Sequence, residues 1–236
     1  MRVKKLADEI MGMSQGKQMD KIFEILDKKG VPFEPKRKGG QFKGAYRLDN
    51  GIVITKMRVK IPETGKEGLL PVIMDSDIYD KHIADGKANV RIEWRSDGKP
   101  RVVVEGHGRD ENGTAPRFWL SHLVTGREAY SSQCVDHIRS NTLINLRKEL
   151  RLCSIGENNR NSVNRAGTGK ELAPDAGQYT YSPARDCRYT LYAYVLMLLG
   201  IITDDELSEV NKVANANGDK IRRWQGERDG DTETCK

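Results

Sequence analysis

The stretch Val135-Asp136-His137-Ile138 is followed by Leu150-Arg151-Leu152-Cys153-Ser154 and then by Glu157-Asn158-Asn159-Arg160-Asn161. The first two stretches suit short strands, and Ser154 is a favoured residue at the start of a helix. Neighbouring residues on a strand point to opposite faces, so Asp136 and His137 would point apart. A strand, a returning strand and a helix would bring Asn158 back beside Asp136.

These residue types are the ones that hydrolyse a phosphodiester. The reaction needs an attacking water, a base that takes its proton and a cation that neutralises developing charge. A histidine ionises near neutral pH, so His137 can serve as the base. The oxygens of Asp136 and Asn158 are hard ligands that suit a divalent cation. The sequence therefore predicts a nuclease with one Mg²⁺ or Mn²⁺ per active site.

The same stretch resembles the HNH endonucleases, in particular the homing type of phages and introns. That family carries Asp-His-Ile, a polar loop, Asn-Leu-Arg and Glu-Asn-x-x-Asn, and residues 136–161 match at similar offsets. Residues 120–124 are similar to the His-Arg-Leu-Val segment before the motif, and residues 74–80 to an Asp-x-x-Tyr element. The resemblance reaches from about residue 45 to residue 162. It implies an α+β fold with a ββα-metal core, preceding β-hairpins and flanking helical segments.

By position, the resemblance makes His137 the general base, Asp136 and Asn158 the metal ligands, and residue 149 the group that orients the histidine. Residue 149 is a glutamate, Glu149. The HNH family has an asparagine at this position, the residue that gives the family name its middle letter. A carboxylate can also accept the imidazole N–H. Two further departures are Ile144 and Leu146, which replace polar residues of the family loop.

These departures leave three interpretations of function open. The first is a metal-dependent HNH endonuclease of the homing type that uses Glu149. The second is a catalytically inactive DNA-binding protein that retains the HNH fold. The third is a nuclease-type domain used only as a protein-interaction scaffold, which predicts no salt-dependent DNA affinity.

The charge of the chain suits a polyanionic partner. Lys and Arg total 40 against 34 acidic residues, a net charge of +6. We expect double-stranded DNA as the partner, with its phosphates bound by residues around the predicted metal site. For each arginine, the alternative is an ion pair with a carboxylate of the protein. The expected contacts are Arg147 and Arg151 first, then Arg139, Arg160 and Asn161. The oligomeric state stays open.

The location of the protein is predicted from its apolar segments and cysteines. No apolar signal core follows the basic start, and the longest apolar run, residues 191–202, is shorter than the roughly 20 residues of a membrane span. We therefore expect no membrane partner and a cytoplasmic protein, in the host cytoplasm if a phage encodes it. The four cysteines form no Cys-x-x-Cys pair, so unpaired thiols are expected rather than a zinc site. They are Cys134, Cys153, Cys187 and Cys235.

Three successive segments are predicted along the chain. Residues 1–44 form an N-terminal helical segment with a basic linker, residues 45–163 the nuclease domain, and residues 164–236 a C-terminal helical segment. Four apolar residues recur at helical spacing before Gly30, which would end that helix: Met19, Ile22, Phe23 and Leu26. Residues 189–199 suit a buried helix, and Thr203 with Glu206 matches a capping box.

Within the nuclease segment, residues 52–61 alternate as in a half-buried strand. Met57 and Val59 lie on one side of that strand, and its other side is basic: Lys56, Arg58 and Lys60. The alternating residues 90–94 and 102–104 predict a β-hairpin with a glycine-containing loop. A short helix or turn is expected at residues 75–80.

Overall fold

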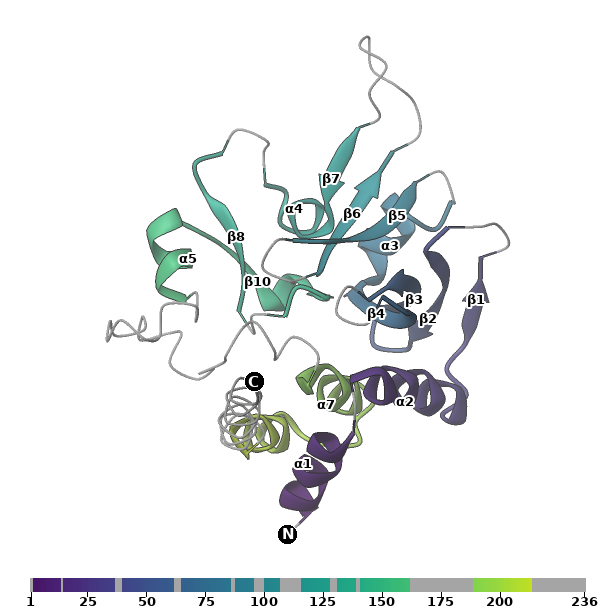
Figure 1. Ribbon diagram of the computed structural model, residues 1–236. Coiled ribbons are helices and arrows are strands. Elements are labelled where there is room, and N and C mark those ends of the chain that lie inside the picture. The colour runs from purple at the N-terminus through teal and green to yellow at the C-terminus, as the bar shows by residue number, and fades with distance from the viewer. Residues whose placement is uncertain are drawn as a thin grey trace, which may run out of the picture. The chain divides into compact units, whose positions relative to one another are not determined.

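The computed structural model describes ten stretches of the chain (Figure 1). They are residues 2–13, 15–36, 40–61, 65–85, 88–95, 100–106, 116–127, 131–138, 141–161 and 189–213. Helices and several separate sheets occur together, so the α+β class is confirmed. Two compact units are present. One joins Met1–Gln18 with Arg188–Lys236, and the other is Met19–Cys187, whereas the sequence places boundaries after residues 44 and 163.

The first unit is helical in its described part. Helix α1 (Arg2–Gly12) buries Ala7 and Ile10 and packs against α7 (Tyr189–Leu198). Residues 191–196 of α7 are all buried, which confirms the predicted buried helix. Gly200 then ends the helix with a φ of +66°, and the N–H of Ile201 reaches back to the carbonyl of Leu196 at 2.9 Å.

The predicted capping box opens the next helix, residues 204–213. The backbone N–H of Thr203 donates to Glu206 Oε2 at 2.9 Å, and the N–H of Glu206 donates to Thr203 Oγ1 at 3.1 Å. Two backbone donors that a helix start leaves without partners are satisfied in this way. Among the described residues, no helix is both long and apolar enough to cross a membrane.

Helix α2 (Gln15–Lys28) also agrees with the sequence. Its four predicted apolar residues are buried, and Gly30 adopts a left-handed φ of +67°. The N–H of Gly30 donates to Asp27 O at 3.0 Å and that of Val31 to Leu26 O at 3.1 Å, the two bonds of a Schellman motif. Asp27 also accepts a hydrogen bond from the Tyr46 hydroxyl at 2.8 Å, which fastens the helix to a sheet.

That sheet has five strands in the order β1-β2-β3-β4-β9. The strands are β1 (Phe33–Pro35), β2 (Phe42–Leu48), β3 (Ile52–Lys60), β4 (Glu67–Asp75) and β9 (Ile144–Asn145). Neighbours are antiparallel except β9, which joins β4 in parallel. The predicted alternation is confirmed in the second half of β3, where Met57 and Val59 are buried and Arg58 and Lys60 are exposed. Its first half is buried on both faces.

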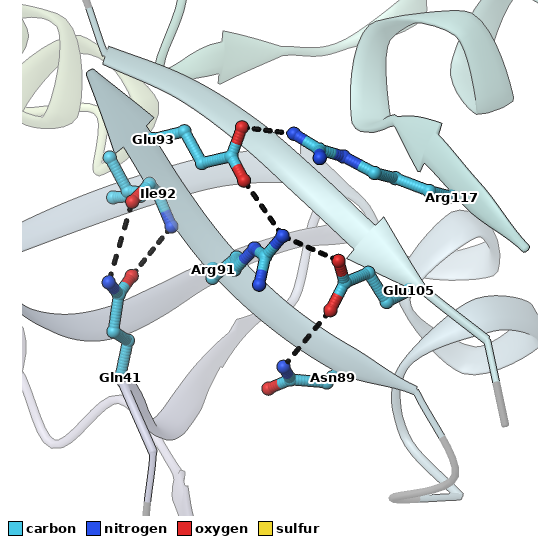
Figure 2. Close-up of polar contacts among 7 residues, drawn as sticks. All are labelled: Gln41, Asn89, Arg91, Ile92, Glu93, Glu105 and Arg117. Carbon is cyan, nitrogen blue, oxygen red and sulfur yellow. Dashed lines mark hydrogen bonds and ion pairs between the residues drawn. The ribbon is translucent and has the colours of Figure 1, made fainter. Parts of the chain in front are cut away.

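A three-stranded antiparallel sheet comprises β5 (Asn89–Trp94), β6 (Pro100–Glu105) and β7 (Arg117–Trp119). Ile92 lies opposite Val102, which confirms the predicted hairpin. Figure 2 shows a chain of ion pairs across this sheet, in which Arg91 bridges Glu93 at 2.9 Å and Glu105 at 2.6 Å. Arg117 contacts the other oxygen of Glu93.

The side chain of Gln41 connects the start of β2 to strand β5 (Figure 2). The N–H of Ile92 donates to Gln41 Oε1 at 2.6 Å, and Gln41 Nε2 donates to the Ile92 carbonyl at 3.4 Å. The amide thus satisfies backbone groups of β5 as a neighbouring strand would. Two short helices complete the described part of this unit before the candidate site: α3 (Ser76–His82), as predicted, and α4 (Leu120–Thr125).

Candidate functional site

The predicted strand, returning strand and helix are all present. Strand β8 (Cys134–His137) pairs antiparallel with β10 (Leu150–Cys153), and α5 (Ile155–Asn161) follows directly. Figure 1 shows the three elements side by side, and α5 contacts β8. In this register Asp136 lies opposite Arg151 and His137 opposite Leu150. Asn158 therefore lies on a helix that packs against the strand carrying Asp136.

A capping box fixes the start of α5. The backbone N–H of Ser154 donates to Glu157 Oε2 at 2.7 Å, and the N–H of Glu157 donates to Ser154 Oγ at 3.2 Å. The predicted N-cap is confirmed, while the reciprocal role of Glu157 was not predicted. The Ser-x-x-Glu spacing carried that signal. Asn158 follows in the first turn, where its N–H donates to Ser154 O at 3.0 Å and its side chain is half-buried.

The loop between β8 and β10 is anchored in the core of its unit. Leu143, Ile144 and Leu146 are all at most 2 % exposed, and the N–H of Ile73 donates to Leu143 O at 2.8 Å. Ile144 then pairs with Ile73 as strand β9. This explains the two apolar departures from the family loop, because Ile144 and Leu146 fill core positions beside the five-stranded sheet.

Asp136 forms an ion pair with Arg151, which is the carboxylate pairing that the sequence offers as the alternative for each arginine. Its Oδ2 accepts a hydrogen bond from Arg151 Nε at 3.0 Å, across the two strands. The Asp136 side chain is 10 % exposed and that of Arg151 27 %. A residue predicted to bind phosphate thus contacts the predicted metal ligand. The two stretches contained both residues, but only the strand register shows that they meet.

The loop brings residue 149 to the end of the His137 strand. The 3₁₀ turn η1 (Arg147–Glu149) places Glu149 directly before β10, and its carbonyl accepts the N–H of Ile138 at 2.9 Å. Glu149 is 6 % exposed, and the Nε2 atom of His137 is shielded from solvent. The backbone therefore holds residue 149 beside Ile138, the chain neighbour of His137.

Arg147 is likewise bonded to carboxylates. Its guanidinium contacts both oxygens of Asp77, with Nη1 to Oδ1 at 2.9 Å, and its backbone N–H donates to Asp75 Oδ2 at 2.9 Å. The guanidinium hydrogen bond lowers the pKa of Asp77 below its ordinary value. These contacts attach η1 to the start of α3, so two separate segments that carry the family resemblance meet here. Arg139 and the side chains of Arg160 and Asn161 lie outside the described residues.

His122 packs against an aromatic ring in this arrangement. It lies on α4, with its ring edge-on to Trp119 at a centroid distance of 4.7 Å. Burial lowers its pKa, with smaller contributions from the charges of Arg127 and Arg101. Helix α4, which carries His122, packs against β8 and β10.

The predicted metal ligands are a carboxylate and an amide. Among the residues that the structure describes, no group of three or more His, Cys, Asp and Glu side chains is arranged to hold a metal ion. The Asp136 and Asn158 pair contains only one residue of these types, so this result does not bear on it. Its oxygen donors suit Mg²⁺ or Mn²⁺, which fill their remaining coordination positions with water and phosphate oxygens.

No protein-family model matches the chain, and no curated protein or solved structure is significantly similar to it. A function can therefore be assigned only from the residues and contacts described above.

Proposed function

We propose that the chain is a metal-dependent HNH DNA endonuclease of the homing type, which hydrolyses phosphodiester bonds in double-stranded DNA. The observation that supports it is the β8-β10-α5 unit, which carries Asp136 and His137 on one strand and Asn158 on the helix packed against that strand. The order of these elements supports the ββα core that the resemblance implies.

In this proposal, His137 removes a proton from the attacking water. Glu149 orients His137, and Asp136 with Asn158 holds Mg²⁺ or Mn²⁺. The bound cation supplies charge stabilisation at the phosphoryl and leaving oxygens. Arg151 already neutralises part of the Asp136 charge, so it tempers the affinity of that carboxylate for a cation. The exposed Arg58 and Lys60 of β3 add positive charge for DNA.

Two observations favour a second candidate, a catalytically inactive DNA-binding protein that retains the HNH fold. The predicted metal ligand Asp136 is bonded to a guanidinium, and Nε2 of the predicted base is shielded from solvent. A site of this kind can keep its fold and its cationic side chains without hydrolysing DNA.

Nicking of a supercoiled plasmid in Mg²⁺ or Mn²⁺ separates the two candidates. We expect His137→Ala to lower the rate by roughly 10²–10⁴-fold, the usual contribution of a general base. His82→Ala, on α3, is the matched control and should retain the rate. Folded wild-type protein that shifts DNA in a gel, more weakly at higher salt, yet never nicks it from neutral to alkaline pH, would establish the inactive candidate.

The role of Glu149 is tested by two substitutions. Glu149→Asn introduces the amide that the HNH family has at this position and should preserve metal-dependent nicking. Glu149→Leu keeps the side-chain volume but has no acceptor for the imidazole N–H, and should lower the rate while leaving DNA affinity unchanged. Equal rates for both variants would exclude an orienting role for residue 149.

A further inference from the structure

The two cysteines of the β8-β10 hairpin lie directly opposite one another. Cys134 and Cys153 are register partners, and their thiols are hydrogen-bonded. Both are free thiols in this structure, Cys153 buried and Cys134 half-exposed. Side chains directly opposite across an antiparallel pair point to the same face, with Cβ atoms roughly 4.5–5.5 Å apart. The two sulfur atoms therefore face each other.

The backbone of this pair suits a disulfide bond. The N–H of Ile138 donates to Glu149 O, one residue beyond the paired strands, whereas the N–H of Glu149 donates to Leu146 O. Hydrogen-bonded positions alternate along antiparallel strands, so we expect Cys134 and Cys153, four residues away on each strand, to occupy one, with Cα atoms about 5.5 Å apart. Disulfides span Cα distances of roughly 4.4–6.8 Å. Disulfides also hold their Cβ atoms roughly 3.5–4.5 Å apart, closer than in an open cross-strand pair of this kind, so bond formation requires rotation of the side chains and a small approach of the two strands.

A soft metal ion is the other ligand that two adjacent thiols can take. Stable thiolate sites for zinc generally have four protein ligands. Among the described residues, no third His, Cys, Asp or Glu side chain joins the two cysteines in such a group. The pair is therefore better suited to form a covalent bond than to hold a metal.

We propose that Cys134 and Cys153 are a redox-active dithiol that forms a reversible cross-strand disulfide with a small-molecule disulfide as oxidant. The more exposed Cys134 sulfur attacks the oxidant and releases one small thiol. The Cys153 sulfur then attacks the mixed disulfide at Cys134 and releases the second. The protein dithiol loses two electrons and two protons, which the two small thiols carry away, and excess reducing thiol reverses both steps.

The bond would act on the candidate site. Cys153 directly precedes Ser154, the cap of α5, and Cys134 lies two residues before Asp136. Oxidation would covalently fix the two strands that carry Asp136 and Arg151 and the point where α5 begins. Formation of the bond does not depend on the proposed nuclease function, because it requires only the register of the hairpin.

The test is oxidation of the full chain with oxidised glutathione, followed by thiol blocking, trypsin digestion without reductant and mass spectrometry. We expect one dominant linked species, which joins the peptides of residues 128–139 and 152–160. Dithiothreitol should restore both free thiols. A Cys187→Ser/Cys235→Ser variant should give the same link, and Cys153→Ser should give only a glutathione adduct on Cys134.

Two results would overturn the proposal. One is a wild-type protein that carries glutathione on Cys134 without closing the internal bond. The other is linkage of Cys134 or Cys153 mainly to Cys187, to Cys235 or to a second chain. Plasmid nicking by the oxidised and reduced forms is a separate measurement, so absence of nuclease activity would leave the disulfide result intact.

Discussion

The Asp136–Arg151 pair can be tested by a double-mutant cycle. Arg151→Met retains the length and apolar stem of the side chain but removes its charge, and Asp136→Asn removes the opposite charge with little change of shape. The double variant Asp136→Asn/Arg151→Met completes the cycle, which isolates the energy of the pair from the other contacts of each residue.

The expected coupling follows from the geometry. At a separation of 3.0 Å and an effective dielectric constant of about 20, two unit charges attract by roughly 332/(20 × 3.0), or about 5.5 kcal/mol. Much of this offsets the desolvation of two ions. What remains is comparable with a hydrogen bond to a charged group, about 1.5–3 kcal/mol. Because Arg151 keeps 27 % of its side chain in water, we expect a coupling of about 2 kcal/mol.

The two single variants should not be equivalent. Arg151→Met leaves the carboxylate of Asp136, which is 10 % exposed, without its guanidinium partner, whereas Asp136→Asn leaves a guanidinium that can turn toward solvent. Arg151→Met is therefore the more destabilising variant.

Urea unfolding followed by tryptophan fluorescence measures the four free energies of unfolding. A coupling below about 0.5 kcal/mol, the usual limit of additivity, would show that the contact contributes nothing to stability and would refute this reasoning.

Three further predictions concern local structure. Gly44→Ala should cost about 3 kcal/mol in urea unfolding, because Gly44 has a φ of +147° and an added Cβ would lie 2.5 Å from the Glu34 carbonyl oxygen. Gly30 has a φ of +67° and open space around it, so Gly30→Ala should lower the free energy of unfolding by only about 1 kcal/mol. Equal losses in the two variants would show that the steric overlap at Gly44 does not affect stability. Ser154→Ala should cost about 1 kcal/mol and speed hydrogen exchange at the start of α5; unchanged exchange would mean that the capping box is not needed there. Since burial lowers the pKa of His122, its neutral form favours folding, so stability should decline as pH falls from about 6.5 through that lowered pKa. His122→Gln should flatten this decline between pH 7.5 and 5, and an unaltered slope would assign it to other groups.

The elements that the sequence predicts are those with local signals. Helix α2 has an apolar periodicity and a glycine stop, and both capping boxes follow the Ser/Thr-x-x-Glu spacing. Strand β4 has no such signal. Its core, Leu70 to Met74, is buried without a break, so side chains on both faces of the strand are covered and no alternation of apolar and polar residues appears.

In the candidate site too, features with a local signal could be predicted from the sequence, whereas contacts between distant residues could not. Local pattern and motif offsets predicted the two strands and the N-cap. The contacts of the arginines could not be predicted, because each depends on a pairing that the sequence does not specify. Arg151 meets Asp136 through the register of β8 and β10, and Arg147 meets Asp77, which lies 70 residues earlier in the chain.

The anchored loop determines how far residue 149 can move relative to His137. Ile144 is held by parallel pairing with Ile73, and three positions later the N–H of Arg147 is held by Asp75, at the end of the same strand. Both attachments lie on β4, a fully paired strand of the five-stranded sheet. The turn that ends at Glu149 therefore takes its position from the sheet, whichever side chain residue 149 carries. An exchange of Asn for Glu here leaves these backbone attachments in place, so cleavage assays of residue 149 variants test the proposed orienting role rather than the fold.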